Sequence, residues 1–180
     1  MAEHLPELRS LRNPKHPGIS CAVNEAFSEA AEVCLARHHR PPKTLLTICC
    51  CKRDVKYNLN WKHPGKVAQR AWLNRDDATR DGAYIIAIAV VEKELGLIAL
   101  SRTDTRTGAD YYIGQPNVLD LEEAFRLEVS GIDHGSIADL KRRLSQKEEQ
   151  AKQGDSCLPA YASVVGFKEA MVFVTRVEDT

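Results

Sequence analysis

The sequence predicts an α/β protein with a mixed β-sheet, and three patterns support that prediction. The segment 78–95 is almost wholly apolar through its middle, which is typical of a buried helix. Three short segments rich in branched or aromatic residues follow, joined too tightly for helical crossovers. An amphipathic segment and two further apolar segments come last. The order helix, three strands, helix, strand therefore indicates an α/β domain whose strands run in mixed directions.

The composition is that of an ordinary globular chain. Its 180 residues suffice for one well-buried domain or a domain with a small appendage, and its hydrophobic and charged contents are 43% and 28%. The formal net charge is zero, so binding to a polyanion would need local basic patches. The longest apolar run, residues 83–91, is well short of the roughly 20 residues of a bilayer-spanning helix. No membrane association is expected.

The cysteines are expected to be reduced thiols. Residues 1–12 carry scattered charges and no apolar core, so a secretory signal is not expected. A cytoplasmic location is therefore expected. A zinc site would need cysteines paired at a spacing of about two to four residues, with a second pair elsewhere. Neither the triplet Cys49–Cys51 nor His38-His39 supplies that pattern. The other cysteines stand singly, at Cys21, Cys34 and Cys157.

Residues 1–66 are expected to form an accessory part that precedes the core. Residues 1–20 hold three prolines and many charges, which indicates an irregular arm. Asn24 is the predicted N-cap of a helix that ends near His38. Lys43–Lys52 and Val55–Trp61 are the predicted strands of a hairpin, with its turn at Arg53-Asp54.

Residues 67–180 are expected to form the core. Asn74–Asp77 is a helix-start signal for the buried helix, which Gly96 ends. Strands are predicted at 97–100, 108–114 and 125–131, with a polar loop at 101–107.

The last helix and strands of the core follow the same reasoning. Ser136 is the predicted N-cap of the second core helix, and Gly154 is its predicted stop. Four apolar residues at helical spacing are expected to face the sheet: Ile137, Leu140, Leu144 and Ala151. Residues 161–167 and 171–177 are the final predicted strands, which could form a hairpin.

Two of the predicted strands each carry one acid among apolar residues. These acids are Asp110 and Glu128. Ionised side chains are rarely placed in a sheet interior unless a cation or a metal compensates them. If the two strands are neighbours, both carboxylates can converge on one hard cation. The sequence therefore predicts a metal site at Asp110 and Glu128.

This arrangement resembles the PD-(D/E)XK nuclease superfamily, which has a restriction-endonuclease-like core of helix, three strands, helix and strand. Asp110 falls at the aspartate of the motif and Glu128 at its glutamate, while Ser130 stands where the motif has lysine. The resemblance implies that Asp110 and Glu128 bind Mg²⁺, or Mn²⁺, and that the protein hydrolyses phosphodiesters of nucleic acid, with DNA as the expected partner. It also implies work in defence, restriction or repair.

The resemblance leaves the position of the motif lysine open. Some members of the superfamily are similar in having this lysine on a neighbouring element. Here the candidates on the following helix are Lys141 and Lys147, and Lys147 lies nearer the centre of the sheet-facing side. Ser130 shares a strand face with Glu128 at about 6.6 Å and could orient a water. The expected catalytic residues are Asp110, Glu128, Ser130 and Lys147.

Further residues could contribute to such a site. Glu92 and Glu94 could add a metal ligand, and Gln146 and Gln150 resemble glutamines that some families carry on this helix. Of the adjacent Tyr111 and Tyr112, one should be in the core, and the other could stack on a base. Trp61 and Trp72 are expected in the core. Several basic residues could either contact phosphates or mark a solvated face: Arg102, Arg106, Lys141, Arg142 and Arg143.

Structural explanations of the two acids stay open beside the metal site. Asp110 could be a turn acid at the start of a strand. Glu128 could form a partly buried ion pair with Arg126 or Lys147. The alternative function is a degenerate nuclease fold that lost its chemistry with its lysine and serves as a binding or assembly subunit, with a protein partner or as a homodimer. No nucleophile elbow and no phosphate-binding glycine loop occurs.

Overall fold

The computed structural model describes residues 3–104, 108–117, 120–153 and 156–177. Within these residues the chain forms an α/β structure around one open sheet of seven strands. The elements, in chain order, are η1 (Leu8–Ser10), α1 (Cys21–His38), β1 (Lys43–Cys50), β2 (Arg53–Asn60), α2 (Lys66–Ala71), α3 (Arg75–Leu95), β3 (Ile98–Arg102), β4 (Tyr111–Gly114), η2 (Leu121–Glu123), β5 (Phe125–Ile132), α4 (Ile137–Lys152), β6 (Ala160–Gly166) and β7 (Met171–Val177). The predicted α/β class with a mixed sheet is confirmed.

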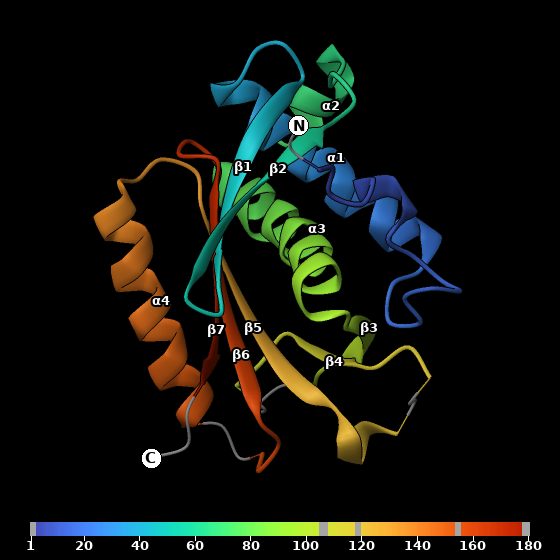
Figure 1. The fold of residues 1–180 in the computed structure, drawn as a ribbon. Coiled ribbons are helices and arrows are strands. Elements are labelled where there is room, and N and C mark those ends of the chain that lie inside the picture. Colours follow the sequence, from blue (N-terminus) through green and yellow to red (C-terminus); the bar gives the residue numbers. More distant parts are fainter. Residues whose placement is uncertain (1–2, 105–107, 118–119, 154–155, 178–180) are drawn as a thin grey trace.

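The strands lie in the spatial order β2-β1-β7-β6-β5-β4-β3. β3, β4 and β5 are successive antiparallel neighbours, whereas β5 and β6 run parallel and α4 makes the crossover between them. Helices α1 and α3 lie on one side of the sheet and α4 lies on the other (Figure 1). The sheet is therefore covered by helices on both faces, and residues of β5 lie between α3 and α4.

Helix α1 begins earlier than predicted. Its N-cap is Ser20, whose hydroxyl accepts a hydrogen bond from the backbone N–H of Val23. Asn24, the predicted N-cap, is buried inside the helix, and its amide donates to the carbonyl oxygens of Leu8 and Leu11. The prediction was wrong because serine and asparagine are both favoured N-caps. The packing of the N-terminal arm on α1 decides between them.

The predicted hairpin of β1 and β2 is present, but its turn comes two residues earlier than expected. Cys50 pairs with Arg53, so Cys51 and Lys52 form the two-residue turn. Both have positive φ, which is the backbone of a type I′ turn. The turn predicted at Arg53-Asp54 was wrong. Aspartate is one of the residues that dominate such turns, so Asp54 carried the local signal. The strand register places Asp54 inside β2 instead.

The N-terminal hairpin extends the sheet of the core. β1 pairs in parallel with β7, and α1 packs against α3. The boundary expected near residue 66 stays a prediction about folding units. The strand pairing and the helix packing join the residues before it to those after it.

Helix α3 has the burial predicted for the apolar segment. Asn74 is its N-cap, and the side-chain oxygen accepts hydrogen bonds from the backbone N–H groups of Asp76 and Asp77. Every residue from 82 to 91 is buried. The helix ends at Gly96, whose positive φ of 67° suits the left-handed conformation of a helix C-terminus. Among the described helices, none has the length and apolar composition needed to cross a membrane.

Replacing Gly131 with alanine is expected to lower the free energy of unfolding by about 2 kcal/mol, because β5 and α3 touch there. The added Cβ would collide with the backbone oxygen of Thr79. It would also lie 2.8 Å from Thr79 Cγ2 and 3.0 Å from Ala83 Cβ. Chemical denaturation measures the loss. The control is Gly65→Ala, where the new Cβ meets nothing within 4 Å, and its change should stay within about 1 kcal/mol. Equal losses at the two positions would contradict the close contact.

Helix α4 begins at the predicted cap, with Ser136 and Asp139 forming a capping box. Leu140 is buried over Gly166, as predicted for a sheet-facing residue. Ala151 is buried as well, and Leu144 is partly buried against it and against Leu140. Ile137 was also predicted to face the sheet, but it is 42% exposed, because the packing of α4 on the sheet begins one turn later. The predicted stop, Gly154, lies outside the described residues.

Candidate active site

Asp110 lies immediately before β4, and its carboxylate interacts with that of Glu128 in β5. The ladder pairs Tyr111 with Leu127, and the N–H of Asp110 also donates to the oxygen of Leu127, at 2.8 Å. The Asp110 carboxylate then takes the place of the next backbone acceptor, because its Oδ2 accepts from the N–H of Val129 at 2.8 Å. This fixed carboxylate stands at the end of the β4–β5 pairing.

A second donor to Asp110 comes from the buried helix. The hydroxyl of Tyr84 in α3 donates to Asp110 Oδ1 at 2.8 Å. Burial and the neighbouring Asp110 carboxylate raise the pKa of Tyr84, so its phenol stays protonated and keeps donating. Asp110 is therefore held from both sides, by the backbone of β5 and by α3. It is more than a turn acid at a strand start.

Glu128 is buried and paired with a lysine from α4. Leu127 and Val129 pack in the main core, which puts Glu128 on the opposite face of β5. The Lys147 ammonium donates to Glu128 Oε1 at 2.6 Å, and the two side chains are only 17% and 5% exposed. Lys147 also donates to Gln150 Oε1 at 3.0 Å. Of the two ion-pair partners considered for Glu128, the structure contains Lys147.

The surroundings of Glu128 disfavour its ionised form. Burial, and after it the nearby Asp110 carboxylate, raise the pKa of Glu128 to about 7. The hydrogen bond and the charge of Lys147 act in the opposite direction but do not cancel it. Two carboxylates that repel each other in a poorly hydrated place are typical of acids that share a cation or a proton.

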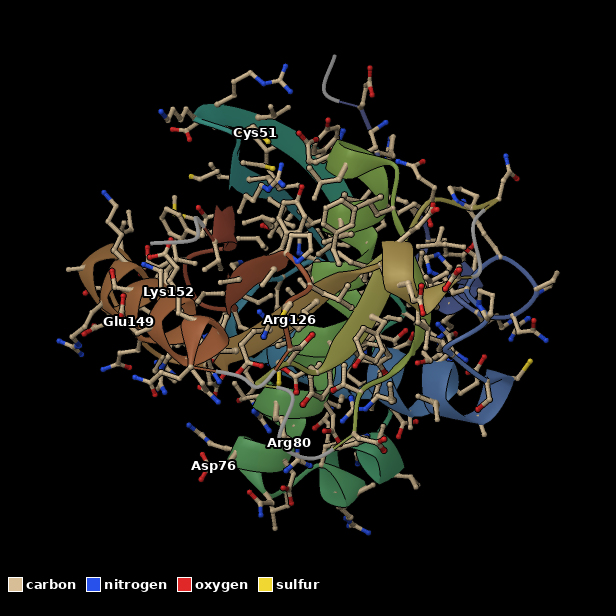
Figure 2. All side chains as sticks on the ribbon, turned by 90° about the horizontal axis from the view of Figure 1, so that it is seen from below. Cys51, Asp76, Arg80, Arg126, Glu149 and Lys152 are labelled. Carbon is tan, nitrogen blue, oxygen red and sulfur yellow. The ribbon has the colours of Figure 1, made fainter. Side chains whose placement is uncertain are left out.

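Asp110 and Lys147 border a cleft of about 320 Å³ between α3 and α4. The cleft is lined by Asp76, Thr79, Arg80, Tyr84, Asp110, Val129, Ser130, Gly131, Arg143 and Lys147. Figure 2 shows Asp76 and Arg80 on the first turns of α3, on the side of the molecule away from Cys51 at the hairpin tip. α3 and α4 therefore supply the walls, and the end of β5 supplies the floor.

Three of the ten residues that line the cleft carry a basic group. The sequence predicted a site role for only some of the ten. Asp76, Arg80 and Tyr84 were missed as site residues, because they lie far from Asp110 and Glu128 in the sequence. Asp76 had been seen only as part of the helix-start signal. The helical spacing of Asp76, Arg80 and Tyr84, each four residues after the last, is the signal that could have grouped them on one face.

The structure brings the four predicted site residues together. Asp110, Glu128 and Lys147 are linked by contacts, and the half-buried Ser130 lines the same cleft. The competing lysine, Lys141, is exposed and lies instead near the thiol of Cys49. The assignment of these residues to catalysis is a proposal, taken up below.

Glu92 and Glu94 do not reach this cleft, so their suggested role as metal ligands is wrong. Glu92 binds Lys15 and His16 of the N-terminal arm. Glu94 accepts a hydrogen bond from the hydroxyl of Tyr57 at 2.6 Å. Both lie more than two helical turns beyond Tyr84, and at 1.5 Å per residue that amounts to about 12 Å or more along α3.

Other residues considered for the site have structural partners. The Arg102 guanidinium stacks over the rings of Tyr84 and Tyr111, at 4.6 and 4.8 Å from their centroids. Tyr111 is fully buried, and Tyr112 packs partly buried in a separate cluster on the opposite face. Arg126 donates to the carbonyl oxygens of residues 151 and 158 in the interior, where Figure 2 labels it.

The remaining predicted residues divide in the same way. Trp61 is buried as predicted, and Trp72 packs partly buried against the core. Gln146 is exposed on the outer side of α4, whereas Gln150 binds Lys147. Arg106 lies outside the described residues.

A second group of metal-ligating side chains occurs in the described part of the chain. Ligating atoms of His38, Asp133 and His134 all lie within 4.8 Å of one another. The Asp133 carboxylate is already engaged, because His38 Nε2 lies 2.8 Å from Oδ1, while Arg37 and Arg75 lie 3.3 and 3.9 Å from Oδ2. Two guanidinium groups beside the acid oppose a dication. We assign this cluster to joining α1 to the segment after β5.

Comparison of the chain with protein-family models, with curated proteins and with solved structures finds no match. The fold and the site define an α/β protein with one acid just before β4, a second acid within the neighbouring strand β5, and a lysine bound to the second acid.

Proposed function

We propose that the protein is a metal-dependent nuclease that hydrolyses phosphodiesters of DNA, built on a restriction-endonuclease-like core. The observation that supports the proposal is that Asp110 and Lys147 border one cleft and that Glu128 contacts both of them. The order α3, β3, β4, β5, α4, β6, with β5 parallel to β6, agrees with what the resemblance implies for that core. A cytoplasmic role in restriction, defence or repair is part of the same proposal.

The chain's own residues fit a hard divalent cation. Asp110 and Glu128 offer carboxylate oxygens, which Mg²⁺ and Mn²⁺ prefer. The raised pKa of Glu128 reports repulsion and burial that a dication between the carboxylates would relieve. When bound, such a cation polarises a phosphate and lowers the pKa of a coordinated water.

Two further side chains would act on the substrate in this proposal. The Lys147 ammonium lies next to Glu128 and would stabilise negative charge that develops on the phosphate. It would thus serve as the lysine that the motif has at the position of Ser130. The Ser130 hydroxyl would accept a hydrogen bond from the attacking water or donate one to it. Asp110, held by Tyr84 and Val129, would keep its position during the reaction.

A second function is favoured by one specific observation. The Lys147–Glu128 pair is largely buried and would hold α4 on β5 even without any chemistry. A protein that kept this pair for stability would be a nuclease-like binding or assembly subunit, whose partner is nucleic acid, another protein or a second copy of the chain.

A cleavage assay separates the two functions. Wild-type protein is incubated with supercoiled and linear DNA, and with RNA, in Mg²⁺, in Mn²⁺ and in chelator. The double variant Asp110→Asn/Glu128→Gln, purified in parallel, serves as the control for contaminating nucleases. Mn²⁺ binding is measured on the same preparations by titration calorimetry.

Cleavage that needs the metal and is lost from the double variant is the expected result. Folded wild-type protein that binds DNA but shows neither cleavage nor Mn²⁺ binding would favour the binding subunit. Cleavage of equal rate in the double variant would exclude this acid pair as the active site.

A further inference from the structure

Arg143 is a cation of the cleft that the described chain leaves without a partner. No hydrogen bond or ion pair joins it to another described residue. The other two cleft cations are engaged: Lys147 binds Glu128, and the Arg80 guanidinium binds Asp77 and Asp81. An unpaired guanidinium that borders a cleft next to acids is available to an anion from outside the chain.

The position of Arg143 on α4 orders it relative to the acids. Arg143 and Lys147 are four residues apart, so they lie on one side of the helix, about 6 Å apart along its axis. Lys147 contacts Glu128, and Arg143 lies one turn closer to the start of α4 than Lys147 does. A nucleic-acid strand with one phosphate at the acids can present its neighbouring phosphate there.

The adjacent Arg142 has a partner within the chain and lies outside the cleft. It is exposed and donates to Asp139 at 2.7 Å, as an i, i+3 pair on the outer side of α4. With Gln146 and Glu149 it borders the outer surface of α4 and not the cleft. The two arginines therefore have the same charge and neighbouring positions, but only Arg143 faces the candidate active site.

We infer that Arg143 binds a backbone phosphate of the nucleic acid next to the one that is cleaved. This inference rests on the proposed function for the identity of the anion. It makes Arg143 a substrate-binding residue that sets the register of the strand on the acids. Its guanidinium presents two parallel N–H donors to phosphate oxygens, which an ammonium does not.

The test is DNA binding by Arg143→Gln, Arg142→Gln and wild type. A short fluorescein-labelled duplex is titrated in Ca²⁺, in place of Mg²⁺, over a series of salt concentrations, and anisotropy gives the affinity. Arg143→Gln should weaken binding by about five- to tenfold at low salt and lower the slope of log K against log salt by about 1. Arg142→Gln should leave the slope unchanged. Arg143→Lys should restore the slope, because the charge remains.

The results separate this inference from the proposed function. A loss of slope in Arg143→Gln alone supports the phosphate contact, even if the wild type never cuts DNA. Equal behaviour of the two glutamine variants overturns the contact, even if the wild type cuts DNA in Mg²⁺. Wild type that does not bind the duplex overturns it as well.

Discussion

Replacing Lys147 with methionine is expected to lower the rate of metal-dependent cleavage by about 10²–10³-fold. Methionine keeps an unbranched side chain of similar reach but removes the charge that would face the developing negative phosphate, and loss of one such group costs about that factor. It also leaves Glu128 buried beside Asp110 without its cation, so Glu128 should become harder to ionise. Single-turnover cleavage of labelled DNA, at saturating enzyme, measures the rate.

Lys152→Met is the matched control for Lys147→Met. Lys152 lies on the same helix and pairs with Glu149 at 3.5 Å, at its exposed end (Figure 2). Its replacement should change the rate by less than about twofold, since exposed pairs contribute little. Similar losses in both variants would mean that the lysine acts through the stability of α4.

A lysine placed at Ser130, the position of the motif lysine, tests whether Lys147 has taken over the role of that lysine. Ser130 lines the cleft on the same face of β5 as Glu128. If Lys147 stands in for the lysine of the motif, Ser130→Lys in the Lys147→Met background should recover about tenfold of the lost rate. The single variant Ser130→Lys, with both lysines present, shows whether the cleft tolerates the longer side chain. A folded double variant without any recovery contradicts the equivalence.

Affinity for Mn²⁺ is expected to fall about tenfold for each pH unit below 7 and to stay level above 7. The pKa of Glu128 is raised to about 7, first by burial and then by Asp110, so below that pH a proton occupies the carboxylate that the metal needs. At pH 5 the affinity should be about 100-fold below its value at pH 8. Titration calorimetry at a series of pH values measures it.

Two variants check the origin of that pH dependence. Glu128→Gln should weaken binding at high pH and abolish the dependence between pH 5 and 7. Glu149→Gln, on the exposed side of α4, should leave both unchanged. A midpoint near pH 4.5 in the wild type would show that Glu128 titrates as an ordinary carboxylate.

The same shift fixes the sign of the pH dependence of stability in the metal-free protein. Between about pH 4.5 and 7 the unfolded chain has lost the Glu128 proton and the native protein still holds it, so stability falls as the pH rises through this window. The expected fall is on the order of 3 kcal/mol, and it should be absent from Glu128→Gln. This trend is the reverse of that of a carboxylate whose pKa is lowered by folding.

The secondary structure of the core followed from local patterns. The apolar segment before Gly96, the strand that carries Glu128 and the cap at Ser136 were predicted, because hydrophobic spacing and caps are properties of neighbouring residues. The strand predicted at 108–114 begins only at Tyr111 and leaves Asp110 just before it. The errors at Asn24 and at Arg53-Asp54 arose where two residues in the same stretch carry equivalent signals. In such places long-range packing or strand register selects one of them.

The sequence alone determined the α/β class and the presence of one acid in or beside each of two consecutive strands, because alternation and helical spacing act over a few residues. Only the tertiary structure decided that Asp110 lies close to Glu128, that Lys147 binds Glu128, and that Glu92 and Glu94 contact other residues. It also added Tyr84, Asp76 and Arg80 to the cleft. These contacts depend on sheet register and helix orientation, which the burial of the whole core fixes at once.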